Sequence, residues 1–374
     1  MSLRVAVDGR EWVEGARTGI GRYLETALRG LAELRPEWEC RVLLGSSGEE
    51  RLALPGLSYL RLPSGPTPWV DQVVLPRRLR AIAPDVFFSP YVKMPWRTPC
   101  PSAVTIHDLF PLTLPPEEGG LAWPGRLRLR LYTARSLARA KAVITVSEAS
   151  ARDIRELFDP DPGRLHVIPE GVDPLFFGEE GTEDAGRRER MGLEAPYLAA
   201  VSNFQPHKNI GLLLEAWSRA AEETGDSLLV LAGEGPRREM LMRAIEGRPG
   251  ADRLRWPGLL EEEDLPVLYR NARALLQPSF AEGFGLPVAE AMACGTPVVV
   301  SDRGSLPEVV GEAGVVLSPH QADAWSHTMV RMLKDEDYRE RNAAAASSRA
   351  ERFHPRRAAG GLAGVLERIA RGSV

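Results

Sequence analysis

The chain has 374 residues, which at about 150 residues per domain predicts two or three domains. Hydrophobic residues make up 44% and charged residues 26%, as is usual for a soluble globular protein. The net charge of −4 excludes a general attraction to nucleic acid, so any contact with an anionic surface must come from a local basic patch.

The first half of the chain alternates short apolar runs with longer amphipathic stretches. The apolar runs predict strands that are buried on both faces, and the stretches with apolar residues three or four positions apart predict helices. In chain order we expect a strand at 4–7, a helix at 21–34, strands at 41–44, 86–88 and 103–106, a helix at 126–140 and a strand at 142–146.

The second half repeats this alternation with a similar spacing. We expect strands at 197–201, 228–232, 254–256, 274–277 and 297–300, and helices at 210–224, 237–247, 262–271, 287–293 and 322–334. Alternating strands and helices of this kind predict an α/β fold with parallel, doubly wound sheets in both halves.

A polar stretch at 178–190 separates the halves and has no apolar face, so it is interpreted as a linker or exposed insertion. The predicted domains are therefore 1–180 and 181–355, each Rossmann-like. The tail at 356–374 is expected to be helical and could pack on either domain, including back on the first. Open α/β sheets bind ligands beyond the carboxyl ends of their strands, so we expect the two domains to face each other across a ligand-binding cleft.

The strongest motif occupies residues 279–297 and reads SFAEGFGLPVAEAMACGTP. A strand ends near residue 277, a glycine-containing turn follows, and Pro287 suits the first turn of the next helix. We expect the N–H groups of Phe284, Gly285 and Leu286 to point at the cleft beside the positive end of the helix dipole. Such an arrangement binds anions and would suit a diphosphate.

Two glutamates flank this turn. Glu290 could accept hydrogen bonds from the two hydroxyls of a ribose, and Glu282 could bind the hydroxyls of a sugar. The alternative is an ordinary helix start with an acidic first turn. The presence of both glutamates, together with the Cys-Gly-Thr-Pro that leads into the next strand, favours a functional site.

These residues resemble the retaining glycosyltransferases of family four, which have the GT-B fold. The family hallmark is Glu-x7-Glu, here Glu282 and Glu290, and residues 301–309 resemble the segment that follows it. The resemblance extends over most of the chain and is densest in the second half. It implies a nucleotide-sugar-dependent hexosyltransferase. We expect no cofactor and no metal, because fixed positive groups would stabilise the leaving diphosphate and no Asp-x-Asp site occurs at a strand end.

Lys208 lies in the loop between a strand and the helix expected from residue 210. An ammonium there can neutralise the charge that grows on a leaving diphosphate. The resemblance implies that Lys208 is the family's phosphate-binding, catalytic lysine, with Ser202 nearby in the donor site. Many relatives carry an arginine near Ser202, and this chain has none there. The residues alone would also allow a solvated loop lysine.

His107 follows a buried strand and should lie at the edge of the cleft. The resemblance implies that it is a catalytic residue that hydrogen-bonds the donor sugar, and the adjacent Asp108 could orient it or cap a turn. A histidine after a strand is otherwise more often structural.

Residues 16–23 open the first helix and include Gly19 and Gly21, which would let donor phosphates or an acceptor approach the backbone. The sequence Thr-Gly-Ile-Gly-Arg-Tyr resembles the start of mannosyltransferases in the family. It favours GDP-mannose over a UDP- or ADP-sugar as donor. The loop at 233–236 is either a lining of the same cleft or a simple turn.

The stretch 125–141 carries six basic residues and no acid, with leucines between them. Such a helix could rest on anionic lipid headgroups and would suit a lipid-linked acceptor, while the simpler interpretation is a solvated helix face. Three widely spaced cysteines, no signal peptide and no bilayer-length apolar run favour a cytoplasmic protein, either free or peripheral on the inner face of a membrane.

Two alternatives to a transferase acting on a glycan or lipid-linked hydroxyl stay open. A nucleotide-sugar epimerase can share the fold, although the Glu-x7-Glu pattern argues against it. An inactive sugar-nucleotide-binding protein is the other, and the joint presence of His107, Lys208, Glu282 and Glu290 argues against loss of activity.

Overall fold

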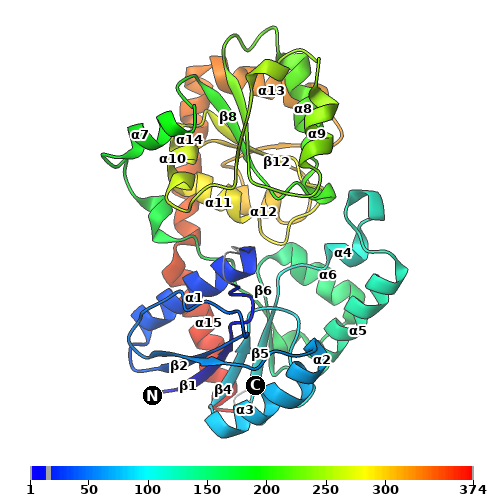
Figure 1. The fold of residues 1–374 in the computed structure, drawn as a ribbon, viewed down its shortest axis with the longest axis vertical. Coiled ribbons are helices and arrows are strands. Elements are labelled where there is room, and N and C mark those ends of the chain that lie inside the picture. The colour runs from blue at the N-terminus through cyan, green and yellow to red at the C-terminus, as the bar shows by residue number, and fades with distance from the viewer. Residues whose placement is uncertain (1, 14–17, 373–374) are drawn as a thin grey trace. The chain divides into compact units, whose positions relative to one another are not determined.

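A computed structural model describes residues 2–13 and 18–372 of the chain (Figure 1). The chain divides into two compact units. Unit 1 comprises Met1–Leu112, Leu121–Gly171 and Phe353–Val374, and unit 2 comprises Thr113–Gly120 and Val172–Arg352. The division therefore falls after Gly171, ahead of the position near 180 expected from the polar stretch, and the C-terminal segment belongs to unit 1.

Unit 1 is built on a seven-stranded parallel sheet with the order β3-β2-β1-β4-β5-β6-β7. Its strands are β1 (Arg4–Asp8), β2 (Glu39–Leu44), β3 (Leu57–Arg61), β4 (Val86–Ser89), β5 (Ser102–Ile106), β6 (Ala142–Thr145) and β7 (Leu165–Val167). The strand order reverses between β1 and β4, which makes their carboxyl ends the switch point where open sheets bind ligands.

The five strands predicted for this half are confirmed. Every residue of β4, β5 and β6 is buried, as expected for strands covered on both faces. The two strands that the sequence did not predict, β3 and β7, lie at the edges of the sheet and are only partly buried. Edge strands do not need a continuous apolar run, so they lack the signal on which the prediction depends.

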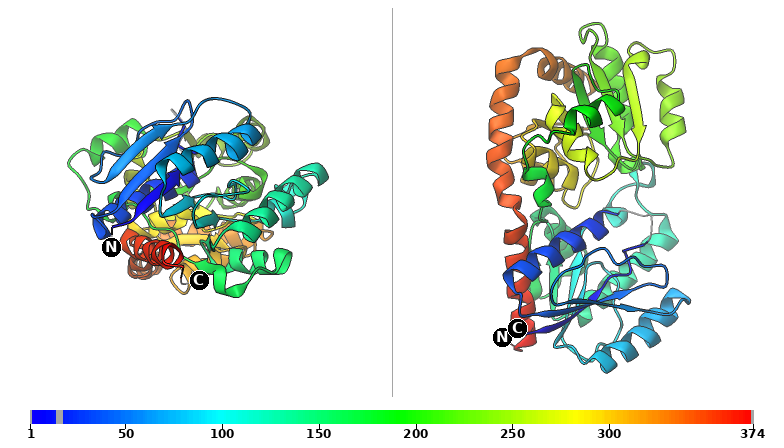
Figure 2. Two further views of the ribbon diagram at one scale, coloured as in Figure 1. Left: turned by 90° about the horizontal axis from the view of Figure 1, so that it is seen from below. Right: turned by 60° about the vertical axis from the view of Figure 1, so that its left-hand side comes forward.

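Helices cover the sheet of unit 1, and the C-terminal helix lies beside the first helix of the chain (Figure 2, right). A Cβ atom on Gly30 would lie 2.6 Å from Cβ of Ala359, so the two helices approach closely at this glycine. The helices are α1 (Gly19–Leu34), α2 (Thr67–Trp69), η1 (Val70–Val74), α3 (Leu75–Ile82), α4 (Phe110–Thr113), α5 (Trp123–Arg139), α6 (Glu148–Phe158), η3 (Pro162–Arg164) and α15 (Pro355–Ala370).

Unit 2 is built on a six-stranded parallel sheet with the order β10-β9-β8-β11-β12-β13, and its switch point lies between β8 and β11. Its strands are β8 (Tyr197–Val201), β9 (Leu228–Ala232), β10 (Leu254–Gly258), β11 (Ala274–Gln277), β12 (Val298–Ser301) and β13 (Val315–Leu317). Fully buried Trp217 and Trp325 anchor its core.

The helices of unit 2 alternate with these strands. They are η2 (Pro116–Glu118), η4 (Pro174–Phe177), α7 (Asp184–Arg190), η5 (Pro206–Lys208), α8 (Ile210–Ala220), α9 (Arg238–Ile245), η6 (Ala251–Arg253), α10 (Asp264–Asn271), α11 (Leu286–Ala293), α12 (Leu306–Val310), α13 (Ala322–Lys334) and α14 (Glu336–Ala350), with η7 (Glu351–Phe353) at the boundary of the units. Within the described residues, no helix is sufficiently long and apolar to cross a bilayer.

Of the two interpretations of the stretch 178–190, the free linker is wrong, whereas most of these residues are exposed, as an exposed insertion would be. The stretch contains the helix α7, which packs on α10 (Figure 1) rather than forming a free linker. Arg187 pairs with Asp264 at 2.9 Å, and Asp184 pairs with Arg270 at 2.6 Å. Because α7 contacts α10 largely through these ion pairs, it needs no apolar face, and its sequence shows no apolar periodicity.

Candidate active site

The loops that follow the adjacent strands β8 and β11 bring two of the sequence-predicted residues into direct contact. Lys208 ends η5 after β8, and Glu282 lies in the turn after β11. The Lys208 ammonium donates to both carboxylate oxygens of Glu282, at 2.7 and 2.9 Å. The side chains are only 14% and 9% exposed, so this is a largely buried ion pair at the switch point of the sheet.

Glu282 is held by two further donors that the sequence analysis did not single out. Gln277 Nε2 and Ser279 Oγ both donate to Oε1 of Glu282, at 2.7 and 2.6 Å. Burial alone would raise the pKa of Glu282, but the charge of Lys208 and these hydrogen bonds outweigh burial, so its pKa lies below the usual value. The carboxylate is therefore fixed in its ionised form.

Backbone contacts between the loops fix the position of Lys208. The Phe280 N–H donates to the His207 carbonyl at 2.7 Å, and the Asn209 amide donates to the carbonyls of Pro278 and Pro319 at 3.2 and 2.9 Å. Burial, with the neighbouring charge of Lys208, lowers the pKa of His207 to about 4. His207 is thus neutral near pH 7 and leaves the ammonium of Lys208 as the cationic group of this loop.

The turn between Glu282 and α11 is held by the loop after β12, whose residues resemble the family segment but had no predicted role. Ser305 donates to the carbonyls of Glu282 and Phe284, at 3.0 and 2.8 Å. Gly285 precedes α11 with a φ of +95°, a conformation that favours glycine. The N–H groups of Gly285 and Leu286 stand before the first intrahelical bond, as an anion-binding helix start requires.

Glu290 lies within α11 and is 1% exposed. The Tyr269 hydroxyl donates to its Oε2 at 3.2 Å. The two glutamates of the motif thus have different surroundings. Glu282 pairs with a lysine at the carboxyl ends of the strands, whereas Glu290 lies within α11 and accepts a hydrogen bond from a tyrosine of α10.

His107, the sequence-predicted histidine of unit 1, follows β5 and uses both ring nitrogens. Its Nδ1 lies 3.0 Å from Glu170 Oε1, and its Nε2 lies 2.8 Å from the Pro90 carbonyl oxygen. Burial alone would lower the pKa of His107, but the hydrogen bond and charge of Glu170 outweigh it and raise the pKa. Because a carbonyl oxygen and a carboxylate can only accept, the contacts fit an imidazolium that donates from both nitrogens.

The side-chain partner of His107 is therefore Glu170, far along the chain, rather than the adjacent Asp108 that the sequence suggested as an orienting group. Glu170 is 7% exposed and lies in the loop after β7. The ring of Tyr23 from α1 packs edge-on against the imidazole, with ring centroids 4.8 Å apart. The charge and orientation of His107 thus depend on residues from three separate parts of the sequence.

Comparison with known proteins identifies the family. The model for glycosyl transferases group 1 matches residues 184–349, and the model for glycosyltransferase family 4 matches residues 17–175. The O-antigen chain mannosyltransferase B of Escherichia coli is 31% identical over 363 residues, which cover 90% of this chain and 92% of the relative. The chain belongs to the retaining family 4 glycosyltransferases.

Two further proteins are similar to this chain, one in sequence and one in fold. The D-inositol 3-phosphate glycosyltransferase of Xylanimonas cellulosilytica is 29% identical over 381 aligned residues, covering 91% of this chain and 89% of the relative. Among solved structures, Anabaena HepE in complex with UDP and glucose superposes with a TM-score of 0.76 over 98% of this chain and 99% of HepE, at 19% identity. The glycosyltransferase thus has the two-sheet GT-B fold.

Ser202, near which this chain has no arginine, lies in a tight turn of the glycosyltransferase. Ser202 Oγ accepts the Phe204 N–H at 3.0 Å, and Phe204 has a φ of +51°. A Cβ atom on Gly233 or Gly235 would lie 2.0 or 1.8 Å from the carbonyl oxygens of Ser202 and Asn203. The two glycines are therefore required by close packing of these loops.

The glycines at the start of α1 differ in their surroundings. The Gly21 N–H donates to Thr18 Oγ1, and its carbonyl accepts from the indole of Trp12, both at 3.0 Å, so Gly21 is part of a helix cap. A Cβ atom on Gly19 would meet no atom within 4 Å, so there is free space beside the backbone at this glycine. Ala16 and Arg17 of the same motif lie outside the described residues.

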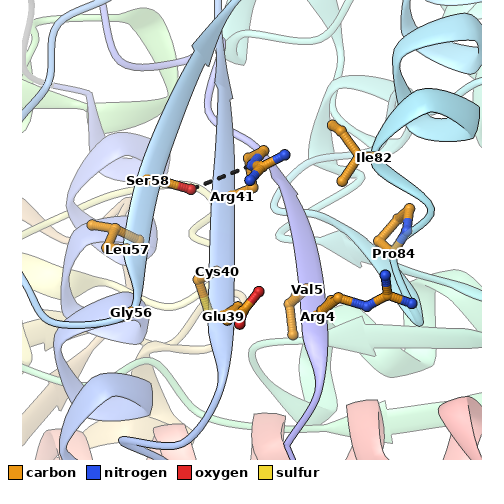
Figure 3. A pocket seen from close by; sticks show the side chains of 10 residues that line it. All are labelled: Arg4, Val5, Glu39, Cys40, Arg41, Gly56, Leu57, Ser58, Ile82 and Pro84. Carbon is orange, nitrogen blue, oxygen red and sulfur yellow. Dashed lines mark hydrogen bonds between the residues drawn. The ribbon is translucent and has the colours of Figure 1, made fainter.

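A hollow in unit 1 is lined by none of these groups (Figure 3). It is lined at the amino ends of β1, β2 and β3, where Arg41 contacts Ser58 at 3.3 Å, whereas the residues of the candidate site follow carboxyl ends. Among residues 2–13 and 18–372, no three His, Cys, Asp or Glu side chains are grouped so that they could hold a metal ion.

Proposed function

We propose that the enzyme transfers a mannosyl group from GDP-mannose to a hydroxyl of a glycan or lipid-linked acceptor. Two observations support mannose. The E. coli relative is a mannosyltransferase, and residues 18–23 carry the Thr-Gly-Ile-Gly-Arg-Tyr sequence. HepE was solved with UDP and glucose, but at 19% identity it supports the fold and not the donor.

The buried Lys208–Glu282 pair is the observation that carries the proposal of sugar transfer, whichever donor is used. In the reaction, the bond between C1 of the sugar and the diphosphate oxygen breaks, and both electrons remain with the diphosphate. The acceptor oxygen forms its bond to C1 on the same face and gives its proton to the departing diphosphate. Negative charge therefore develops on the diphosphate, where a preorganised ammonium such as that of Lys208 stabilises the transition state.

For the remaining groups we propose the roles that the sequence suggested. The N–H groups of Phe284, Gly285 and Leu286 would share the diphosphate with Lys208, and Glu282 would accept hydroxyls of the sugar. We assign the ribose to Glu290 and a contact with the donor sugar to His107. Ser202, Gly19 and Gly21 would shape the donor site through their backbone rather than by charge.

The donor is tested by thermal shift with GDP-mannose, UDP-glucose and ADP-glucose in turn. A ligand that binds the folded state raises the melting temperature by mass action, so we expect the largest rise with GDP-mannose. A rise with UDP-glucose alone would refute the mannosyl assignment and leave the transferase assignment intact.

The role of Lys208 is tested by release of GDP from GDP-mannose, both in hydrolysis and with added acceptors. We expect Lys208→Ala to lower turnover about a hundredfold, the usual effect of losing one transition-state donor. Lys334→Ala, at the exposed end of α13, is the matched control and should behave as wild type. Near-normal turnover in both Lys208→Ala and Glu282→Ala would defeat the assignment.

Loss of Lys208 also leaves the Glu282 carboxylate buried without its cation, which can cost about 3–5 kcal/mol of stability. Assays therefore run well below the melting temperature of each variant. The double variant Lys208→Ala/Glu282→Gln removes that charge. It should recover stability without recovering turnover.

A further inference from the structure

The helix α5 exposes three large apolar side chains on the face that does not pack on unit 1, while its Leu137 packs in the core of that unit. The side chains of Trp123, Leu127 and Leu131 are exposed by 73%, 43% and 56%. The buried residues of the helix are Thr133, Ser136 and Leu137, two of which are polar. A helix that only packs on its own protein shows the reverse, with its apolar stripe inward and its polar residues in water.

The exposed apolar residues form one continuous stripe. Trp123, Leu127, Leu131, Ala134 and Ala138 are spaced by three or four positions, so they lie on a single face, and all five are exposed. We call this set the apolar stripe. Its length, from the first turn of α5 to its last, distinguishes it from an isolated exposed leucine.

Arginines flank the apolar stripe on both sides. Arg128, Arg135 and Arg139 are exposed along one side, and Arg130 is exposed along the other. Residues 125–141 contain no acid, and within the part of the chain that the structure describes none of the first three arginines forms an ion pair. The guanidinium of Arg130 lies 5.7 Å from the ring centroid of Phe158, the last residue of α6.

A second aromatic group extends the same surface. The guanidinium of Arg135 lies 4.2 Å from the ring centroid of Trp96, and Trp96 is 47% exposed. Tryptophan favours the boundary between apolar chains and polar headgroups, because its ring is largely apolar and its N–H is polar. Arginine side chains beside it can reach the phosphates of the same layer.

We propose that the apolar stripe and its flanking arginines rest on a membrane surface of anionic phospholipid. Trp123 and the two leucines would enter the headgroup region, and the arginines would bind lipid phosphates. Charge complementarity selects this occupant. A second copy of α5 packed symmetrically on the first would oppose arginines to arginines, which disfavours a dimer through this face. The inference goes beyond sugar transfer and does not depend on the donor.

The test is co-sedimentation of the full chain with vesicles of phosphatidylcholine alone or mixed with phosphatidylglycerol. We expect binding to the mixed vesicles that weakens as salt is raised, and much weaker binding to phosphatidylcholine. The triple variant Arg128→Glu/Arg135→Glu/Arg139→Glu should bind at least about a hundredfold more weakly, because each basic residue contributes about fivefold. Trp123→Ser/Leu127→Ser/Leu131→Ser should also lose binding.

The matched control changes exposed residues of unit 2, where α9 carries Met240, Met242 and Arg243. Met240→Ser/Met242→Ser and Arg243→Glu should sediment like wild type. All variants alter exposed positions and should keep the wild-type melting temperature, which rules out misfolding as the cause of lost binding.

Three results would overturn the proposal. The first is wild-type protein that stays in the supernatant, and the second is α5 variants that sediment as well as wild type. The third is a molar mass by light scattering that falls from dimer to monomer in the α5 variants, which would assign the stripe to a second copy of the chain. The assay uses no nucleotide sugar, so its failure and the failure of the proposed function are distinguishable.

Discussion

The ion pair between His107 and Glu170 makes the stability of unit 1 depend on pH. A histidine whose pKa is raised by folding contributes stability that is fully present below its unfolded pKa of about 6.5 and is lost as pH rises through the folded pKa. We expect Glu170→Gln, which keeps a hydrogen-bond acceptor but removes the charge, to cost about 2 kcal/mol near pH 5.5. The cost should shrink as pH rises toward 8.5.

Thermal unfolding of wild type and variant across that pH range measures the effect, and the ring resonances of His107 report its pKa directly. Glu50→Gln is the matched control, because Glu50 pairs with Arg61 at 3.7 Å on the surface, with 54% of its side chain exposed. A Glu170→Gln deficit that grows with pH, or an unchanged His107 pKa, would contradict this account.

The residues of the site divide into those that a sequence motif can reveal and those that it cannot. Lys208 and Glu282 lie in loops that directly follow buried strands, and a glycine turn follows Glu282, so chain position marks both residues. Glu170 lies 63 positions from His107 in a loop that carries no such mark, and only the fold brings the two together. Gln277 could have been predicted from the sequence but was not. It is a buried polar residue at the end of an otherwise apolar strand, and such a residue requires a hydrogen-bond partner.

At the level of elements, the contact between α1 and α15 offers a test of close helix packing. A Cβ atom on Gly30 would lie 2.6 Å from Cβ of Ala359, a rigid neighbour that cannot rotate away. We expect Gly30→Ala to destabilise unit 1 by about 1–3 kcal/mol, because the gain in helix propensity is smaller than the cost of separating the helices. Adding Ala359→Gly should recover part of the loss, as measured by thermal unfolding.

Gly360 is the matched control, because it lies in α15 and a Cβ atom there would meet nothing within 4 Å. Gly360→Ala should stabilise the protein by about 0.5–1 kcal/mol through helix propensity alone. If both glycine variants were stabilised equally, the close contact between the helices would be refuted.

Buried elements were predicted well and exposed or polar elements poorly. The strands β8, β9 and β11 and the helix α13 cover the residues that the sequence predicted, because each carries a clear apolar run or periodicity. The short edge strands β3 and β7 are partly exposed and carry neither signal, and the apolar run of β13 is only three residues long. α14 was missed for a similar reason, since only Ala346 and Ala350 of its residues are buried.

For the whole molecule, the decisive feature is that unit 1 is discontinuous in sequence. The C-terminal helix α15 belongs to unit 1 and covers α1, although unit 2 lies between them in the chain. The sequence could not choose between the two domains for this helix, because its apolar face would fit either core. The structure decides through specific contacts, such as the ion pair of Arg35 with Glu367 at 2.8 Å.

Unit 1 should therefore fold without unit 2 only if α15 is retained. A Cβ atom on Gly171 would lie 2.9 Å from Cα of Pro355, so the two chain segments of unit 1 meet at this point. Joining Gly171 to Phe353 through a short glycine-serine linker should give a soluble fragment with cooperative thermal unfolding. A fragment of residues 1–171 alone exposes the apolar face of α1 and should bind a hydrophobic dye and melt without a sharp transition.

A variant of the linked fragment serves as the control. A single polar substitution in α15 disrupts the packing of this helix on unit 1 without changing the length of the fragment. Leu366 is fully buried, so Leu366→Asp in the linked fragment should restore the behaviour of residues 1–171. Calorimetry of the three fragments separates the possibilities. If residues 1–171 alone unfolded as sharply as the linked fragment, α15 would not be required for cooperative folding, and the cooperative unit would end at Gly171.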